Sequence, residues 1–166
     1  MEQKYIDFFL NCSLEVSQIE TVEISHPSFT ETRYLVRNTL KPFTANDENG
    51  ISKTFLYAPM QISASAVKDN MDASIEINLG DVGTVIGVEV ERMENDDTFD
   101  IEPKLIYRLY RSDDKMSPML ISKLDVTDLV MTKDGCKITA RAPKFNVNKT
   151  GERYTISRFP MLRGVL

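Results

Sequence analysis

The chain has 166 residues, a formal net charge of −5 and a sequence pI of about 5.0. Hydrophobic residues make up 42% of it, so a chain of this length can bury a core without help from a metal or a disulfide. The acidic balance argues against a protein that grips nucleic acid, because phosphate binding needs clustered Lys and Arg.

The N-terminal stretch predicts a short amphipathic helix over residues 4–11, where Tyr5, Phe8 and Phe9 recur at near-helical spacing. Its apolar part is too short and too interrupted for a secretory signal or a membrane span. We therefore expect a protein that is made in a cytoplasm and has no membrane partner.

Beyond this helix the hydrophobic period changes to two, which is typical of half-buried strands. Strands are predicted over 19–24 and 33–37, the first ended by the turn at 26–27. A turn cluster at 46–50 ends in Asn-Gly, which favours a type I′ hairpin, with the return strand over 53–60. Alternation over 61–67 and 73–79 then predicts two more strands around a polar turn, and such a succession suggests an antiparallel sheet.

Residues 81–93 are ambiguous between helix and strand. Glu89, Arg92 and the spacing of the apolar residues suit a helix that Asp81 would cap. The β-branched residues, Gly83 and Gly87 favour an extended segment instead. We expect a central helix here.

The strand over 105–111 alternates Tyr and Arg with aliphatic residues. Such a strand can form a cross-strand aromatic ladder, and stacking of single-stranded nucleic acid on Tyr107, Arg108, Tyr110 and Arg111 is a minor alternative. Strands over 124–131 and 137–142 follow, joined by a turn that contains Asp-Gly, a strong hairpin signal.

The final stretch, residues 143–166, has no clean hydrophobic period and is basic and aromatic. This composition is typical of an extended arm that gains order by lying on its own domain or on a neighbour. The predicted organisation is a single β-rich domain over 1–142, with the N-terminal helix, and a C-terminal arm over 143–166. The predicted fold class is mainly β (α+β): an antiparallel β-barrel or sandwich with one central helix.

A search for catalytic motifs finds no catalytic residue, metal site or cofactor site. His26 is the single histidine, and its place before Pro27 favours a turn in which the imidazole bonds locally. The paired acids at 96–97 and 113–114 lie in predicted surface turns and lack the spacing of a calcium loop. The glycines at 80–87 follow no phosphate-loop pattern. Cys12 and Cys136 are read as two free thiols, although a disulfide between them stays open.

Three stretches together resemble a family of unknown function from long-tailed bacteriophages, whose members lie in the tail-tip gene cluster. They are residues 21–29, 104–110 and 152–162. The first carries the opening pattern EI-x-HP-x-F, and the last carries the closing pattern YT-x-x-RFP-x-L. The matching positions are Glu23, Ile24, His26, Pro27 and Phe29 in the opening, and Tyr154, Thr155, Arg158, Phe159, Pro160 and Leu162 in the closing.

The resemblance implies a structural virion protein of the tail tip or baseplate, with motif residues that serve fold or assembly. We expect a ring subunit between tail tube and hub. Its partners would be copies of itself, in a hexamer or trimer, and neighbours such as the distal tail protein and the baseplate hub. It would be made in the cytoplasm of the host bacterium and end in the virion tail. The alternative is a soluble β-sandwich that binds carbohydrate or protein, and an enzyme is the weakest hypothesis.

Overall fold

The computed structural model describes residue 6 and residues 16–64, 74–80, 83–96, 98, 100–132 and 135–143. Three predicted features lie outside this part of the chain: the N-terminal helix apart from Ile6, the turn at 68–70, and the C-terminal arm from residue 144 on. The described residues form a mainly β structure with one helix of 13 residues, α2 (Gly83–Asn95). The predicted fold class and the central helix are confirmed.

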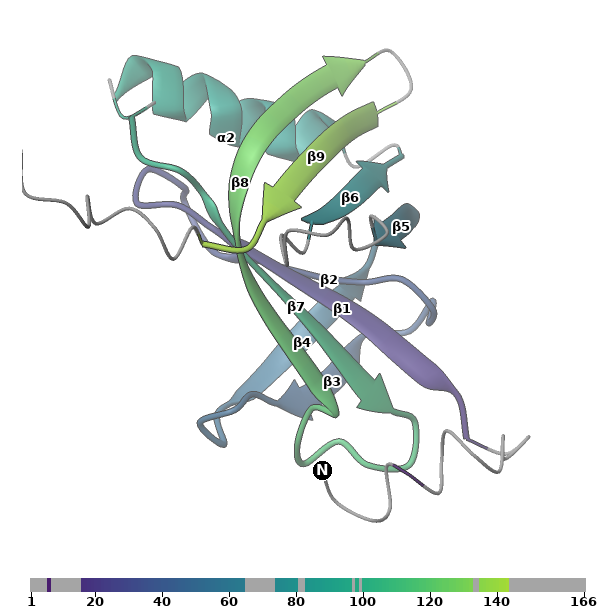
Figure 1. Ribbon diagram of the computed structural model, residues 1–166. Helices are drawn as coiled ribbons and strands as arrows, with labels where there is room; N and C mark the ends of the chain where they lie inside the picture. Colours follow the sequence, from purple (N-terminus) through teal and green to yellow (C-terminus); the bar gives the residue numbers. More distant parts are fainter. Residues whose placement is uncertain are drawn as a thin grey trace, which may run out of the picture.

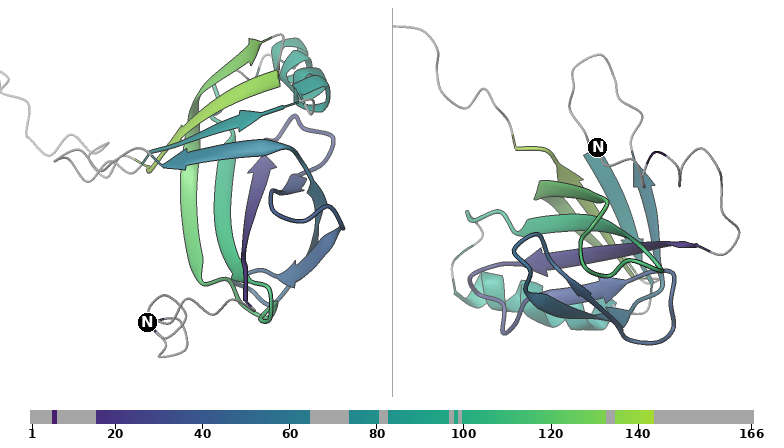
Figure 2. Two further views of the ribbon diagram at one scale, coloured as in Figure 1. Left: turned by 90° about the vertical axis from the view of Figure 1, so that its right-hand side faces the viewer. Right: turned by 90° about the horizontal axis from the view of Figure 1, so that it is seen from below.

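Nine strands form one open, mixed sheet in the order β3-β4-β2-β1-β7-β8-β9-β6-β5. The sheet curves strongly, with β9, β6 and β5 toward one end and the hairpin of β3 and β4 toward the other (Figures 1 and 2), and α2 lies beside β8 and β9. The strands are β1 (Gln18–Ser25), β2 (Arg33–Val36), β3 (Phe43–Asn46), β4 (Ser52–Tyr57), β5 (Met60–Ala64), β6 (Ser74–Leu79), β7 (Lys104–Arg111), β8 (Leu120–Thr132) and β9 (Gly135–Arg141).

The main hydrophobic core fills the inside of this curve. Alternate residues of β1, β6, β7, β8 and β9 point inward, which is the period of two that the sequence shows. Ile86 of α2 packs against the same core. The buried strand residues of this core include Val22, Ile24, Leu35, Ile75, Ile77, Leu79, Leu105, Tyr107, Leu124, Val126, Ile138 and Ala140.

A second, smaller core lies on the opposite face of β1 and β7. The hairpin of β3 and β4 covers this face, and Phe55 and Tyr110 are fully buried in it. The rings of Phe43 and Tyr110 meet edge to face at 5.6 Å, and those of Tyr34 and Phe55 at 5.7 Å. Full burial of one such aromatic side chain contributes about 1.5–3 kcal/mol. β1 and β7 are therefore buried on both faces over part of their length, as in a sandwich.

The predicted pairing of the first strands is partly wrong. The turn near Asn49-Gly50 exists, and Gly50 has a φ of 77°, but the antiparallel partner of the return strand β4 is β3. β4 runs parallel to β2, with Leu35 opposite Leu56. The sheet is therefore mixed rather than purely antiparallel. β3 has only four residues, too few for its period to be visible in the sequence.

The hairpin of β8 and β9 is confirmed, with Thr132 opposite Gly135. Gly135 has a φ of 141°, and a Cβ at this position would lie 1.9 Å from the carbonyl oxygen of Leu79. Only glycine allows this approach between the hairpin and the end of β6. The ladder of β8 and β9 shifts register between Val126 and Asp128, where a β-bulge re-aims the strand.

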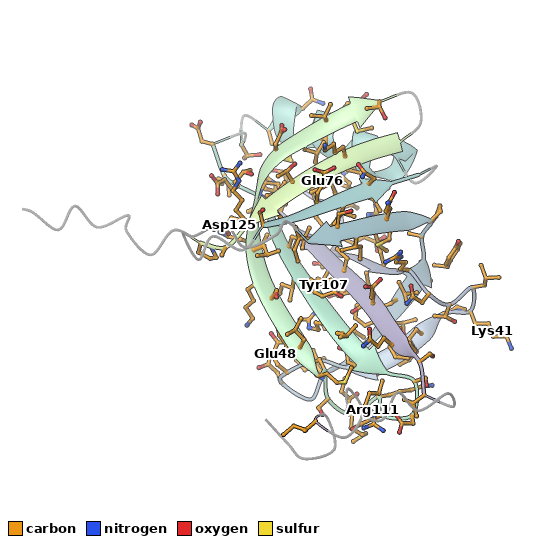
Figure 3. All side chains as sticks on the ribbon, turned by 45° about the vertical axis from the view of Figure 1, so that its right-hand side comes forward. Lys41, Glu48, Glu76, Tyr107, Arg111 and Asp125 are labelled. Carbon is orange, nitrogen blue, oxygen red and sulfur yellow. The ribbon has the colours of Figure 1, made fainter. Side chains whose placement is uncertain are left out.

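Two ion pairs on the outer face link neighbouring strands; Figure 3 shows the side chains of the sheet, with Glu76 and Asp125 labelled. Lys137 of β9 pairs with Glu76 of β6 at 2.8 Å, and Lys104 of β7 with Asp125 of β8 at 2.6 Å. Arg111 at the end of β7 pairs with Asp113 in the turn that follows, at 2.6 Å. Exposed pairs of this kind contribute about 0–1 kcal/mol each, so the two cores provide most of the stability.

Candidate functional site

The opening motif forms the end of β1 and the turn that follows it. Ile24 is buried in the main core. His26 is also buried: its Nε2–H donates to the carbonyl oxygen of Ile101 at 3.0 Å, and its Nδ1 accepts from the backbone N–H of Ser28 at 3.1 Å. The predicted local bonding of the imidazole is confirmed by the Ser28 contact, whereas the bond to Ile101, 75 positions further along the chain, was not predicted. Because both ring nitrogens are engaged, the tautomer with the proton on Nε2 is the one that fits.

Phe29 and Ser28, in the turn after β1, contact the main core and the segment that follows α2; we call these contacts between the turn and the α2 region the junction. The Phe29 ring packs against the main core and lies 5.5 Å from the His26 ring. The Ser28 hydroxyl shares a 2.7 Å hydrogen bond with the Thr98 hydroxyl. The turn that Pro27 begins is thus bound to residues about 70 positions further along the chain.

Glu89 of α2 completes the junction. Its side chain is 1% exposed, and it accepts hydrogen bonds from the Thr30 backbone N–H at 3.0 Å and from Arg33 Nη2 at 2.5 Å. Burial alone would raise the pKa of this carboxyl, but the hydrogen bonds from Thr30 and the charge of Arg33 outweigh burial and lower it. The Glu89 carboxylate is therefore charged and holds the segment between β1 and β2 against the helix.

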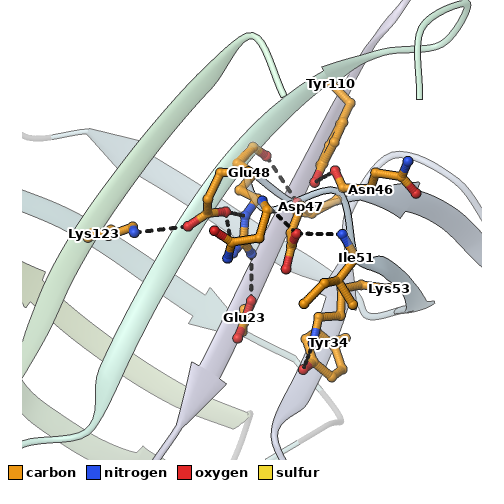
Figure 4. Close-up of polar contacts among 12 residues, drawn as sticks. Glu23, Tyr34, Asn46, Asp47, Glu48, Ile51, Lys53, Tyr110 and Lys123 are labelled. Atoms are coloured by element: carbon orange, nitrogen blue, oxygen red, sulfur yellow. Dashed lines mark hydrogen bonds and ion pairs between the residues drawn. The ribbon is translucent and has the colours of Figure 1, made fainter. Parts of the chain in front are cut away.

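Glu23 belongs to a second polar cluster, on the opposite face of the sheet (Figure 4). The Arg108 guanidinium, 3% exposed, donates to Glu23 at 2.6 Å and to Glu48 at 2.9 Å, and Lys123 Nζ lies 2.9 Å from the other Glu48 oxygen. Burial raises the pKa of Glu48, but hydrogen bonds from Lys123, its own backbone and Arg108 lower it to about 2. The cluster fixes the turn between β3 and β4 over β7.

This turn is also held by Asp47, which is buried. Its carboxylate accepts the backbone N–H groups of Asn49 at 2.8 Å and Ile51 at 2.9 Å, and the Tyr110 hydroxyl donates to the Asn46 carbonyl at 3.0 Å (Figure 4). Asp is favoured in turns for this capacity to bond its own backbone. The turn is therefore held rigidly by hydrogen bonds within itself and to β7.

A groove lies between α2, the segment that precedes β7, and the second half of β8; we call it the α2–β8 groove. Its volume is about 380 Å³. Its apolar side chains are Val90, Met93, Pro103, Val126 and Leu129. Its other lining residues are Thr127 and three acids, Asp100, Glu102 and Asp128, all of them exposed.

Cys136 and the Tyr and Arg residues of β7, which the sequence offered as candidate functional groups, have structural roles in the described part of the chain. Burial raises the pKa of the Cys136 thiol to about 11, which keeps it protonated and unreactive. The nucleic-acid alternative for β7 is wrong, because Tyr107, Arg108 and Tyr110 are buried and cannot stack on bases. In the described part of the chain, no group of three or more His, Cys, Asp or Glu is arranged to hold a metal ion. No helix in the described residues is long and apolar enough to span a bilayer.

The residues of the opening motif lie on two different faces of the sheet. Glu23 lies on the outer face of β1 with Arg108, whereas Ile24, His26 and Phe29 lie on the side of the main core. Pro27 is exposed in the turn. The closing positions Tyr154, Thr155, Arg158, Phe159, Pro160 and Leu162 lie outside the described residues. Sequence reasoning missed Glu89 and Arg108 as buried ionic partners, since a charged residue within an alternating or helical pattern normally indicates the solvent face.

A model of a protein family described as "Domain of unknown function (DUF1833)" matches residues 10–155. The match includes both polar clusters, the groove and the start of the closing motif. A search of curated proteins found no match to the chain.

Proposed function

The chain belongs to the DUF1833 family of domains of unknown function, and we propose that it is a structural, non-catalytic protein of the tail tip or baseplate of a long-tailed phage. The proposal rests on the resemblance of both end motifs to the phage tail-tip family. In this role the protein is a ring subunit between tail tube and hub. It contacts copies of itself, as a hexamer or trimer, and neighbours such as the distal tail protein and the hub.

The contacts that the side chains of the opening motif make support the structural role. Glu23 bonds to Arg108, His26 bonds to Ile101 and Ser28, and Phe29 packs on the core. Each of these side chains is occupied by contacts inside the protein, as expected of residues that maintain a scaffold. Catalytic groups would instead point into a cleft, and none of Glu23, His26 and Phe29 lines the α2–β8 groove.

A second candidate is a soluble β-sandwich that binds another protein. The α2–β8 groove favours it, because it combines apolar walls with acidic side chains. Carbohydrate is less favoured as the ligand. Sugar sites use exposed aromatic rings, and among the large exposed hydrophobic side chains of the described residues Tyr57 is the aromatic one.

The test is the mass of the purified protein in solution, measured by light scattering, alone and after mixing with each neighbouring tail protein. We expect a closed oligomer, or a complex that forms on mixing, because closed symmetry is the rule for such assemblies. A chain that stays monomeric with every tail partner would contradict the proposal and favour the soluble binding module.

A further inference from the structure

The α2–β8 groove borders an open edge of the sheet. β7 pairs with β8 as far as Asp125, and the Val126 backbone N–H then donates to the Pro103 carbonyl at 2.9 Å. From there to Thr132, the ladders of the described residues pair β8 with β9 alone. The other edge of this half of β8 therefore offers backbone donors and acceptors to an added strand.

The side chains around this edge define what kind of strand fits. The walls of the groove are apolar, and Val130 and Met131 on β8 are 43% and 44% exposed. The carboxylates of Asp100, Glu102 and Asp128 supply three negative charges. A segment that binds here should be extended, partly apolar and basic.

The C-terminal segment of this chain, residues 144–166, has that chemistry. It carries five basic residues and one acidic residue, a charge of +4, so the rest of the chain carries −9 of the total of −5. Its apolar side chains include Phe145, Tyr154, Ile156, Phe159 and Leu162. The charge contrast between the segment and the rest of the chain is the complementarity that directs docking.

We propose that the α2–β8 groove binds the C-terminal segment of a neighbouring copy of this chain, as a strand added to β8. The inference rests on the proposed function, since it names the contact that joins subunits of the ring. The segment follows β9 in the sequence, and β9 occupies one edge of β8, whereas the groove lies at the other edge. A groove and a segment on different parts of one chain make a head-to-tail contact, the type that closes rings.

Cross-linking in the full-length protein tests the proposal. One chain carries Thr127→Cys in the groove and a tagged chain carries Met161→Cys, both with Cys12→Ser. Cys136 stays, because it is buried. We expect a bismaleimide to link the two chains into a dimer of mixed mass. Thr44→Cys, exposed on β3 at the far edge of the sheet, replaces Thr127→Cys as the control and should not cross-link.

A charge-reversal set tests the recognition itself. Replacing Asp100, Glu102 and Asp128 by Lys should lower the cross-linking yield by about tenfold at low salt, since each removes an attraction and adds a repulsion. Reversing Arg153 and Arg158 to Glu in the tagged chain should restore the yield. The matched control reverses three acids elsewhere, Glu31, Glu76 and Asp113, whose side chains are 68%, 41% and 46% exposed, and should leave the yield unchanged.

A chain that carries both cysteines separates this inference from the proposed function. If it cross-links only within itself, or not at all, while light scattering still gives the mass of a ring, the groove proposal is overturned and the ring stands. If the single-cysteine chains cross-link to each other and the charge swap restores a lost link, the neighbouring segment is the occupant.

Discussion

At Arg108 a guanidinium group lies between two carboxylates and is almost fully removed from water. Arg108→Ala would leave Glu23 and Glu48 without their shared cation. Breaking a buried ion pair by removing one partner costs about 3–5 kcal/mol, so we expect the free energy of unfolding to fall by about that amount. Urea denaturation followed by circular dichroism measures it.

Lys104 provides the control for this substitution. It lies on the same strand, pairs with Asp125, and its side chain is 62% exposed. Lys104→Ala should change the free energy of unfolding by less than about 1 kcal/mol. Equal losses for the two variants would mean that burial adds nothing to the Arg108 cluster.

The stability that Glu48 contributes to the same cluster depends on pH. Its pKa in the folded protein is about 2, below the ordinary value of 4.5. A lowered pKa means that the native state favours the charged carboxylate, so its contribution to stability is present above pH 4.5 and is lost as the pH falls toward 2. Glu48→Gln should therefore weaken the fall in stability over this range. Parallel urea midpoints for both proteins between pH 5 and pH 2 would contradict the assignment.

At the level of single residues, the sequence does not show which distant segments cover each face of a strand. Alternation in the β7 region correctly predicted a strand, which carries Leu105 and Tyr107 on one face and Arg108 and Tyr110 on the other. Both faces are buried, because the hairpin of β3 and β4 folds over the second one. Contacts between distant segments are not contained in a local period, so the burial of Arg108 could not be predicted.

Among the elements, the hairpin of β8 and β9 depends most on one residue. Gly135→Ala would place a Cβ against the Leu79 carbonyl at a φ that L-residues rarely adopt. Strain of this kind costs about 1–3 kcal/mol, and the clash with backbone atoms adds to it. We expect a loss of stability in that range or above, measured as a lower urea midpoint.

Gly87→Ala is the matched control within α2. Among the described residues, its Cβ would meet the flexible end of Met131, at 3.3 Å. Alanine favours a helix over glycine by about 1 kcal/mol, so this variant should be neutral or more stable. A similar loss at both positions would show that the Gly135 backbone relaxes around the methyl group.

Element prediction succeeded where the period was long and failed where it was short. The strands near 19–24, 73–79 and 105–111 and the late hairpin follow clear alternation and are confirmed. β3, with four residues, gave no such signal. The parallel pairing of β2 with β4 was missed as well, because the turn at Asn49-Gly50 indicates a hairpin without indicating its first strand.

For the whole molecule, the strongest expectation concerns the C-terminal arm. All nine described strands and α2 end before residue 143. Deleting residues 143–166 should therefore leave the melting temperature within a few degrees while abolishing assembly. Thermal denaturation and light scattering on the same sample measure both properties. Unfolding of the shortened chain would mean that the arm is part of the fold, and unchanged assembly would remove it from the contact.

The place of β1 in the sheet has a consequence for synthesis on the ribosome. β1 pairs with β7, and the hydrogen-bonded residues Thr21 and Arg108 are 87 positions apart. At about 5–20 residues per second, β1 would wait roughly 4–17 s for β7 to be synthesised. During that interval β2 can pair with one edge of β1 while the other stays open. A chaperone that binds exposed strands would meet the nascent chain in this window.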